Sequence, residues 1–531
     1  MAAMKKSHSA PIADDEVFGD LEKGNATHDP AGSELDLEDK TDMETSRVPS
    51  LTQDDASKPT DPNNPVPAPQ QQVNLADWNG PDDPENPMNW PMWVRVYHST
   101  IPALFGFAVT FGTSIYTPAV GDIMRSFDVS RTVALLGLTF YTLGLGFGPI
   151  VTAPLSEGHG RKPVYLISSP VFMLLTLGAA YCKNFPGFCV CRLLAGMAGS
   201  PALAVGAGTS ADVFLPRQRA VVTSMFLLAP FAGPALGPVV GGFIAQYKTW
   251  QWTQYCILFV TLPIFLASLF TRETYKPIIL KRRAQKLGLP SPVPSGPNLK
   301  NTLVLKFARP MYMLFTEPVV FFFSMYAAFV FAVLFLFFAA FPFIFARPPY
   351  GFTLSQVGLT FLVFGVGVMM GSATSVVVDR TIYQKKHREA IAAGKTHADP
   401  EHRLYSAMVG GAGMCLSLFW FGWCADKGVH WAVTLVGAIP FGWGNVCLFT
   451  SAMLYTVDFY GPMVGASAVA ANGVARYTLG AVFPLFTVQM YEALGVGWAT
   501  SLLGFLSLAM IPIPFLFFKY GPAIRARSQY L

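Results

Sequence analysis

The chain has 531 residues, of which 52% are hydrophobic and only 13% are charged. A soluble domain carries charges on about a quarter of its residues, so this composition excludes an ordinary soluble protein and indicates a membrane protein. The net charge of +5 is unevenly divided. Residues 1–90 hold 19 Asp and Glu against 6 Lys and Arg, a balance of −13, and the rest of the chain holds 13 against 31, a balance of +18. The basic excess is spread over short loops instead of one stripe, so it does not indicate nucleic-acid binding.

Residues 1–92 are predicted to form an acidic tail. They contain acidic runs and a stretch rich in Pro and Gln, with few aromatic residues before Trp78. Such a segment buries too little apolar surface to offset its conformational entropy, so we expect it to be disordered and cytosolic. It lacks a cationic start followed by an apolar run, and it is therefore not a signal peptide.

From Trp93 onward, apolar stretches of about 20 residues recur, which is the length that crosses a hydrocarbon core. We predict twelve membrane-spanning helices, at residues 98–121, 132–155, 163–182, 187–209, 220–246, 252–271, 317–342, 356–377, 404–424, 430–454, 462–487 and 496–518. A β-barrel would alternate polar and apolar residues, which these stretches do not. The predicted fold class is therefore an all-α polytopic membrane protein.

A basic, Pro-containing loop at 272–316 divides these helices six and six. We predict an N-terminal half at 93–271, a C-terminal half at 317–518 and a short tail at 519–531. Two pseudo-symmetric six-helix halves are the architecture of a rocking transporter, which holds its substrate near the midplane between them.

The basic residues predict the orientation of the helices. With the N-terminus inside, the inner loops and the C-terminal tail hold 22 Lys and Arg, and the outer loops hold 6. Cytoplasmic loops carry the excess of basic residues, so we expect both termini to be cytosolic. Shifting the count by one helix would break this pattern.

The loop after the second span contains Glu157, Gly160, Arg161 and Lys162. Gly160 allows a tight turn, and the two cations remain at the anionic inner surface of the membrane. Glu157 ends the helix and is able to pair with a neighbouring cation. An ordinary basic inner loop is the alternative interpretation.

Two arginines are predicted to lie inside the membrane, Arg192 in span four and Arg476 in span eleven. A charge at the centre of a span costs roughly 2.5–3.5 kcal/mol on insertion scales, so its first interpretation is functional. Arg476, with Asn472 one turn before it, is a candidate to line a cavity. For both arginines the alternative is a structural hydrogen bond to a neighbouring helix.

Span five carries a small-residue motif. Its glycines lie four residues apart on one face, which lets another helix approach closely, and its prolines remove backbone donors and bend the helix. The motif consists of Gly233, Pro234, Gly237, Pro238, Gly241 and Gly242.

Three further patches, at 83–90, 272–277 and 309–318, accompany these motifs. As a set they resemble the major facilitator superfamily from about residue 80 to the C-terminus, and within it the fungal twelve-span drug:proton antiporters. That group contains polyamine, cycloheximide-resistance and azole exporters and many exporters of fungal secondary metabolites. The loop after span two departs from the family pattern at Ala153, Glu157 and Gly158.

The resemblance implies a proton-coupled efflux transporter, such as a multidrug-resistance or toxin exporter, that moves small amphipathic organic compounds. The span-five motif is associated with antiporters, and Arg192 matches an intramembrane arginine implicated in proton coupling. A proton carrier needs a carboxylate, yet no predicted span has one at its middle. Our hypothesis is that Arg192 tunes coupling, that Asp122 or another boundary carboxylate carries the proton, and that Glu157, Arg161 and Lys162 take part in gating.

We expect a monomer in the lipid bilayer of the plasma membrane, or alternatively of the vacuole, driven by the proton gradient without a cofactor. An uptake carrier for a nutrient, polyamine or vitamin is one alternative, against which the span-five motif argues. A non-transporting membrane sensor is another. An enzyme is least expected, because the sequence has no phosphate-cradling loop, no catalytic triad and no metal-ligand cluster.

Overall fold

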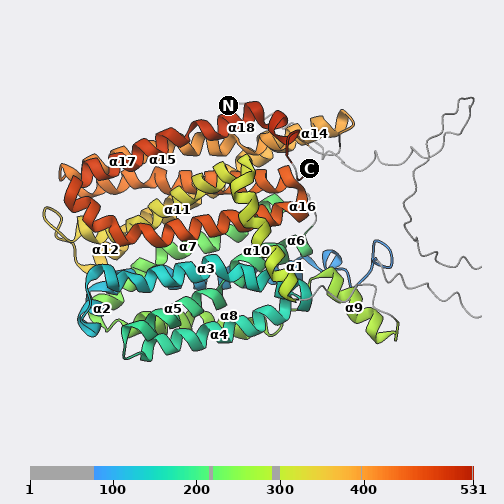
Figure 1. Cartoon of the computed structure of the whole chain (residues 1–531), viewed down its shortest axis with the longest axis horizontal. Helices are drawn as coiled ribbons and strands as arrows, with labels where there is room; N and C mark the ends of the chain where they lie inside the picture. The colour runs from blue at the N-terminus through green and yellow to red at the C-terminus, as the bar shows by residue number, and fades with distance from the viewer. Residues whose placement is uncertain (1–76, 215–218, 290–298, 396–397, 529, 531) are drawn as a thin grey trace, which may run out of the picture. The chain divides into compact units, whose positions relative to one another are not determined.

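The computed structural model describes residues 77–214, 219–289, 299–395, 398–528 and 530 (Figure 1). These residues form helices and connecting loops, and no strand occurs among them. The prediction of an all-α fold is confirmed. Most of the predicted acidic tail, residues 1–76, lies outside the described residues.

The N-terminal half contains six spanning helices. They are α1 (Met92–Ser114), α3 (Arg131–His159), α4 (Arg161–Tyr181), the consecutive α5 (Phe185–Gly199) and α6 (Pro201–Val213), α7 (Arg219–Tyr247) and α8 (Gln251–Ser268). The short η2 (Thr117–Ala119) and α2 (Val120–Phe127) follow α1 at one end of the bundle. Pro201 is the first residue of α6, where a backbone N–H would have no partner within the helix. Because only Ser200 separates α5 from α6, the two helices form one span that is interrupted at this residue.

The C-terminal half repeats this plan. Its helices are α11 (Pro318–Phe345), the consecutive α12 (Leu354–Thr360) and α13 (Leu362–Val378), α15 (Tyr405–Asp426), α16 (Trp431–Leu494), and the consecutive α17 (Val496–Met510) and α18 (Pro512–Arg525). The 64 residues of α16 are two spans, because Gly461 has a φ of 72° and a ψ of 173° that break the helix. A positive φ is readily adopted only by glycine. The break falls between the two predicted spans 430–454 and 462–487.

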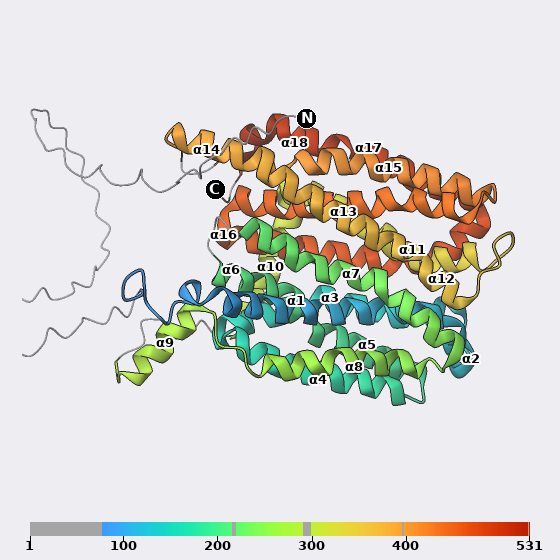
Figure 2. The ribbon, with the colours of Figure 1, turned by 180° about the vertical axis from the view of Figure 1, so that it is seen from behind.

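Ten helices in the described part of the chain are long and apolar enough to cross a membrane. The other two of the twelve are α8 and the second part of α16, which are less apolar. Gln251 and Gln254 lie in the first turn of α8, and Asn472 and Arg476 lie within the second part of α16. Both helices nevertheless run beside the others in the bundle (Figures 1 and 2).

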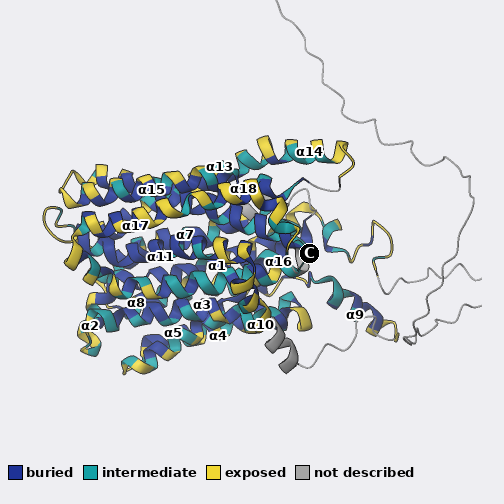
Figure 3. Cartoon of the chain, turned by 45° about the horizontal axis from the view of Figure 1, so that its top comes forward, coloured by how far each residue is buried: buried dark blue, intermediate teal, exposed yellow. Residues whose placement is uncertain are grey.

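The burial pattern fits a lipid-covered bundle. Figure 3 shows buried residues along the inner faces of the helices and exposed residues toward the outside. Large apolar side chains are among the exposed ones, including Phe270 at 79%, Phe315 at 76% and Trp93 at 74%. So much exposed apolar surface on a soluble protein would be an aggregation liability, whereas in a bilayer it contacts lipid.

The segments assigned to the tail and the linker contain further structure. The linker holds α9 (Lys276–Lys286) and α10 (Leu299–Thr316), and the last tail residues form η1 (Pro87–Asn89). The Arg283 guanidinium of α9 binds Asp83 at 2.8 Å and Glu85 at 2.7 Å. Residues 77–91 are therefore held against α9.

Between α13 and α15 lie η4 (Asp379–Tyr383), α14 (Gln384–Ala392) and η5 (Pro400–Arg403).

Candidate functional site

A cavity of about 1530 Å³ lies between the two halves. Its walls come from α1, α3, α6 and α7 on one side and from α11 and α16 on the other. They are mainly apolar, with Phe226, Phe231, Phe331, Phe335 and Phe449 among them. A large apolar cavity with a few polar groups is the usual form of a site for organic molecules.

The cavity extends to one end of the bundle, where charged residues line it. Arg161 binds Asp212 at 3.2 Å, and the backbone N–H groups of Arg161 and Lys162 donate to the Glu273 carboxylate at 2.8 and 3.2 Å. The Arg161 guanidinium also lies 4.7 Å from the ring centre of Tyr275. This cluster ties the start of α4 and the end of α6 to the segment before α9.

The C-terminal half has a matching cluster at the same mouth. Arg403 binds Asp458 and Asp379, each at 2.8 Å, and its guanidinium lies 3.4 Å from the centre of the Tyr383 ring. Burial lowers the pKa of Arg403, but its two carboxylate neighbours and Tyr383 outweigh that effect and raise the pKa above its ordinary value. Arg403 therefore stays charged and joins η4, η5 and the first part of α16.

The sequence analysis missed this second cluster, although a signal for it was present. Asp379 and Arg380 follow the second span of the C-terminal half, as Glu157 and Arg161 follow the second span of the N-terminal half. Because the two halves are structural repeats, a charged cluster at the first position predicts one at the second. Glu273 was also missed, although it lies in the quoted patch 272–277.

Arg192 does not line the cavity. It is 1% exposed, and it donates from Nε to the Gly137 carbonyl at 3.3 Å and from Nη2 to the Gly112 carbonyl at 3.1 Å. Its guanidinium lies 4.1 Å from the centre of the Tyr141 ring and 5.2 Å from that of Tyr116. It thus connects α5 to α3 and α1, an arrangement that matches the alternative structural interpretation.

The glycines of the span-five motif lie against α1. A Cβ atom on Gly233, Gly237 or Gly241 would overlap atoms of Thr110, Ser114 and Ile115, respectively. The Ser114 hydroxyl donates to the Gly233 carbonyl at 3.1 Å, which fixes the two helices at this short separation.

Two other residues of the motif face the opposite half and the cavity. A Cβ on Gly242 would lie 2.5 Å from the Leu354 carbonyl of α12, which belongs to the C-terminal half. Pro234 lines the cavity. The motif therefore packs on α1 through Gly233, Gly237 and Gly241, lines the cavity through Pro234, and contacts the other half through Gly242.

Most of the remaining predicted site residues lie at the cavity. Glu157, Arg161, Asn472 and Arg476 line the cavity. Lys162 borders the mouth, with its Nζ donating to the Leu269 carbonyl at 3.4 Å. Asp122 lies outside the lining, where it accepts a hydrogen bond from the Trp250 N–H at 2.9 Å and pairs with Arg125 at 3.5 Å.

At the end away from the mouth, the halves are joined by direct contacts. Gln489 donates to the Thr132 hydroxyl at 2.8 Å, and the Ser355 N–H donates to Gln246 at 3.0 Å. Nearer the middle, Thr139 donates to the Ala481 carbonyl at 2.8 Å. The cavity is therefore closed at this end by hydrogen bonds between the halves.

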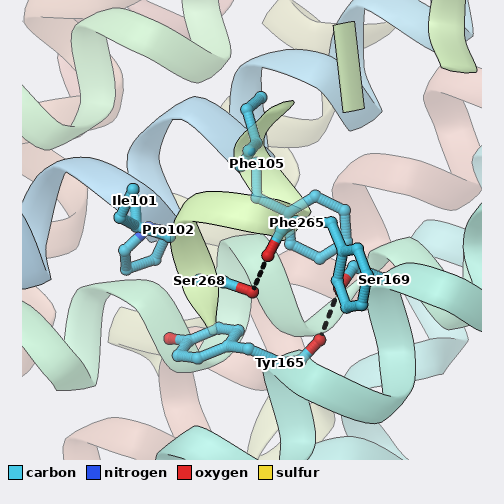
Figure 4. A pocket seen from close by; sticks show the side chains of 8 residues that line it. Ile101, Pro102, Phe105, Tyr165, Ser169, Phe265 and Ser268 are labelled. Carbon is cyan, nitrogen blue, oxygen red and sulfur yellow. Dashed lines mark hydrogen bonds between the residues drawn. The ribbon is translucent and has the colours of Figure 1, made fainter. Parts of the chain in front are cut away.

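A second hollow, between α1, α4 and α8, is not a candidate site. Its volume is about 10 Å³, and Figure 4 shows Phe105, Tyr165 and Phe265 around it. Both hydroxyls nearest to it donate to their own helices, Ser268 to the Phe265 carbonyl at 2.7 Å and Ser169 to the Tyr165 carbonyl at 2.6 Å. There is room for little more than one water molecule.

Comparison with known proteins places this architecture in a family. The family model of the Major Facilitator Superfamily matches residues 103–484. Among solved structures, the proton:xylose symporter XylE bound to 6-bromo-6-deoxy-D-glucose has a TM-score of 0.61 at 14% identity, covering 81% of this chain and 96% of that one. This likeness supports the fold alone.

Relatives of higher identity carry transporter names. The chain is 37% identical to Polyamine transporter 4 of Saccharomyces cerevisiae, over 86% of this chain and 73% of the relative. It is 36% identical to the ascochitine biosynthesis cluster MFS transporter of Didymella fabae, over 86% and 89%, and to Efflux pump FUB11 of Gibberella moniliformis, over 85% and 76%. These relatives are transporters and not enzymes, as the sequence analysis expected. The chain is a multi-pass membrane transporter that belongs to the major facilitator superfamily.

Proposed function

We propose that the chain exports small amphipathic organic compounds, such as drugs, toxins or secondary metabolites, in exchange for protons. The observation that carries this proposal is the cavity between the halves, which reaches one end of the bundle and is closed at the other. Its mainly apolar walls suit compounds that also partition into membranes. Relatives named as an efflux pump and as a transporter of a biosynthesis cluster support the direction of transport.

The charge distribution supports an inward-open state. The mouth lies at the end of the bundle where the basic segments 272–309 and 380–403 emerge. Basic loops remain in the cytosol, so both termini and the mouth are assigned to the cytosolic side. We assign the tail 1–92, the linker 272–316 and the end 519–531 to that side as well, in the plasma membrane or alternatively the vacuolar membrane.

The glycine motif of α7 supports alternating access. Gly241 packs on α1 within its own half and Gly242 on α12 of the other half. Small residues let helix backbones approach closely. In our proposal the contact between Gly242 and α12 is closed in the inward-open state and opens when the two halves rock, while the contact between α7 and α1 is kept.

Carboxylates at the mouth are better placed than Asp122 to exchange protons. Asp212 and Asp458 line the cavity, and each pairs with an arginine. Protonation of either carboxylate would weaken its arginine pair and loosen the mouth. We expect Asp212→Asn or Asp458→Asn to flatten the pH dependence of transport and Asp122→Asn to leave it unchanged. The reverse result would restore Asp122 as the proton carrier.

Accumulation of labelled hydrophobic compounds in cells that express the chain tests the proposed function. We expect lower accumulation than in control cells for at least one compound, and loss of that difference when a protonophore collapses the proton gradient. Higher accumulation would support an uptake carrier instead. A difference that persists with the protonophore would contradict proton coupling.

A further inference from the structure

We infer that the exported compound carries an acidic group, and that Arg476 binds this group in the middle of the membrane. The inference rests on the proposed function, because it names the chemical class of the substrate for the same cavity. It predicts a site selective for an organic anion with an aromatic or other flat apolar body.

Arg476 lies deep in the cavity. It lines the cavity wall and stands 15 residues after the break at Gly461, which corresponds to about 22 Å of helix. Because Gly461 lies at the mouth end, beside Asp458, this rise places Arg476 near the middle of the bundle. Arg192, by contrast, is sealed among three helices and does not line the cavity.

Among the described residues, the Arg476 guanidinium has no ion-pair or hydrogen-bond partner. Within the described ranges, no carboxylate lies within 4 Å of its guanidinium and no hydrogen bond satisfies it. Its Nε is covered from solvent and unpaired. Buried polar groups are nearly always satisfied, and a charge in a membrane span normally has a counter-charge or a carbonyl. A bound acidic group would supply the counter-charge that the described residues do not provide.

The carboxylates that line the cavity cannot serve as that partner. Asp212 and Asp458 bind Arg161 and Arg403 at the mouth, and Glu157 lies at the end of α3 in the same region. The lining holds four arginines, Arg161, Arg309, Arg403 and Arg476, and three carboxylates. The deep part of the cavity is therefore electropositive, and this positive field attracts anions.

The surroundings of Arg476 favour a flat anion. The centres of three aromatic rings lie near its guanidinium carbon, at 4.5 Å for Phe449, 4.8 Å for Tyr477 and 5.0 Å for Phe331. These rings orient the guanidinium and offer faces against which an aromatic ligand can stack. The planar fork of arginine matches a carboxylate or sulfonate through two parallel hydrogen bonds.

A polycation would be a poor ligand in the same place. An ammonium group near Arg476 would meet a like charge without any carboxylate at that depth to offset it. Although the chain is 37% identical to a protein named Polyamine transporter 4, its cavity favours the opposite charge.

Three naphthalene probes, one anionic, one neutral and one cationic near neutral pH, test this inference. Labelled 2-naphthalenesulfonate, naphthalene-2-sulfonamide and 2-naphthyltrimethylammonium share one ring system and differ in charge. Their equilibrium binding is measured on the purified full chain reconstituted in vesicles of phosphatidylcholine, which contain no anionic lipid headgroup to compete. We expect the sulfonate to bind roughly tenfold or more tightly than the other two probes.

Variants assign that preference to Arg476. Arg476→Gln should weaken sulfonate binding by about tenfold and leave sulfonamide binding nearly unchanged, whereas Arg476→Lys should retain part of the preference. Arg125→Gln is the matched control, because the Arg125 side chain is 81% exposed and outside the cavity. If Arg476→Gln does not fold, the wild-type preference and the Arg476→Lys variant decide.

Several results would overturn the inference. They are equal binding of the three probes, preference for the cation, no binding of the sulfonate, or an equal loss for all three probes in Arg476→Gln. The accumulation assay in cells reports separately on export. Export without selectivity for anions would refute only the substrate class, whereas absence of export would refute the proposed function itself.

Discussion

At the scale of single residues, the two intramembrane arginines have different environments. Both look alike in the sequence, as lone cations in apolar spans. In the structure, Arg192 donates to the Gly137 and Gly112 carbonyls and is sealed. Arg476 lines the cavity, and among the described residues no ion pair or hydrogen bond reaches its guanidinium. The sequence could predict their depth in the membrane, but not which neighbouring helix each would face, because that depends on the rotation of each helix in the bundle.

Arg192→Lys tests the positioning role of Arg192. Lysine keeps the charge but cannot donate to two carbonyls on different helices in the same fork geometry, so we expect a loss of about 1.5–3 kcal/mol in stability. Thermal unfolding of the purified full chain measures it. Transport per folded molecule should still follow the pH gradient. A variant with wild-type stability whose transport ignores the gradient would show that Arg192 acts in coupling.

At the scale of elements, the sequence predicted helices well and their ends and partners less well. The span-five glycines predicted a close helix contact, and α1 is the helix that makes it. The partner could not be predicted, since small residues show only that some backbone approaches. The sequence predicts a disordered tail and a loop for the linker, whereas the described parts of both contain helices. Their 77–91 and α9 portions contact each other through Asp83 and Arg283, a pairing between residues 200 positions apart.

Gly241→Ala tests the seam between α7 and α1. The added Cβ would overlap the Ile115 carbonyl, and such overpacking usually costs about 1–3 kcal/mol. We expect reduced thermal stability and slower transport in vesicles. Gly121→Ala is the control, because nothing lies within 4 Å of the position of its Cβ. Equal behaviour of the two variants would mean that the close packing is not required.

The contact between residues 77–91 and α9 is tested by Asp83→Asn. Asp83 is 4% exposed. Burial raises the pKa of Asp83, but hydrogen bonds from Asn79, Arg283 and Glu85 outweigh burial and hold the pKa below its ordinary value. The stabilisation by this carboxylate is therefore present above the ordinary pKa and is lost as the pH falls through the lowered one.

We expect roughly tenfold lower hydrogen-exchange protection factors over residues 77–91 in Asp83→Asn at pH 7, which corresponds to about 1.4 kcal/mol. The exposed neighbour Asp82 provides the matched control, Asp82→Asn. In the wild type, protection should remain constant down to the ordinary carboxyl pKa and fall only below it. Unchanged protection in Asp83→Asn would show that the segment is held by other contacts.

At the scale of the whole molecule, composition predicts a membrane protein, and the recurring apolar stretches with the loop at 272–316 predict two six-helix halves. The family match agrees with that architecture. The cavity could not be predicted, because its walls combine residues far apart in the sequence, such as Thr110 and Asn472. The sequence could not predict the conformational state either, because that state depends on contacts between the halves, such as the hydrogen bond from Gln489 to Thr132.

Proton-driven export is best tested by transport into vesicles that contain the purified full chain. A labelled permanently charged compound, taken from those exported in cells, is added outside vesicles whose lumen is made acidic or alkaline. We expect protein-dependent accumulation with an acidic lumen, because protons leaving the vesicle drive the compound inward, and loss of accumulation with a protonophore. Accumulation driven by an alkaline lumen, or accumulation that does not depend on the pH gradient, would contradict it.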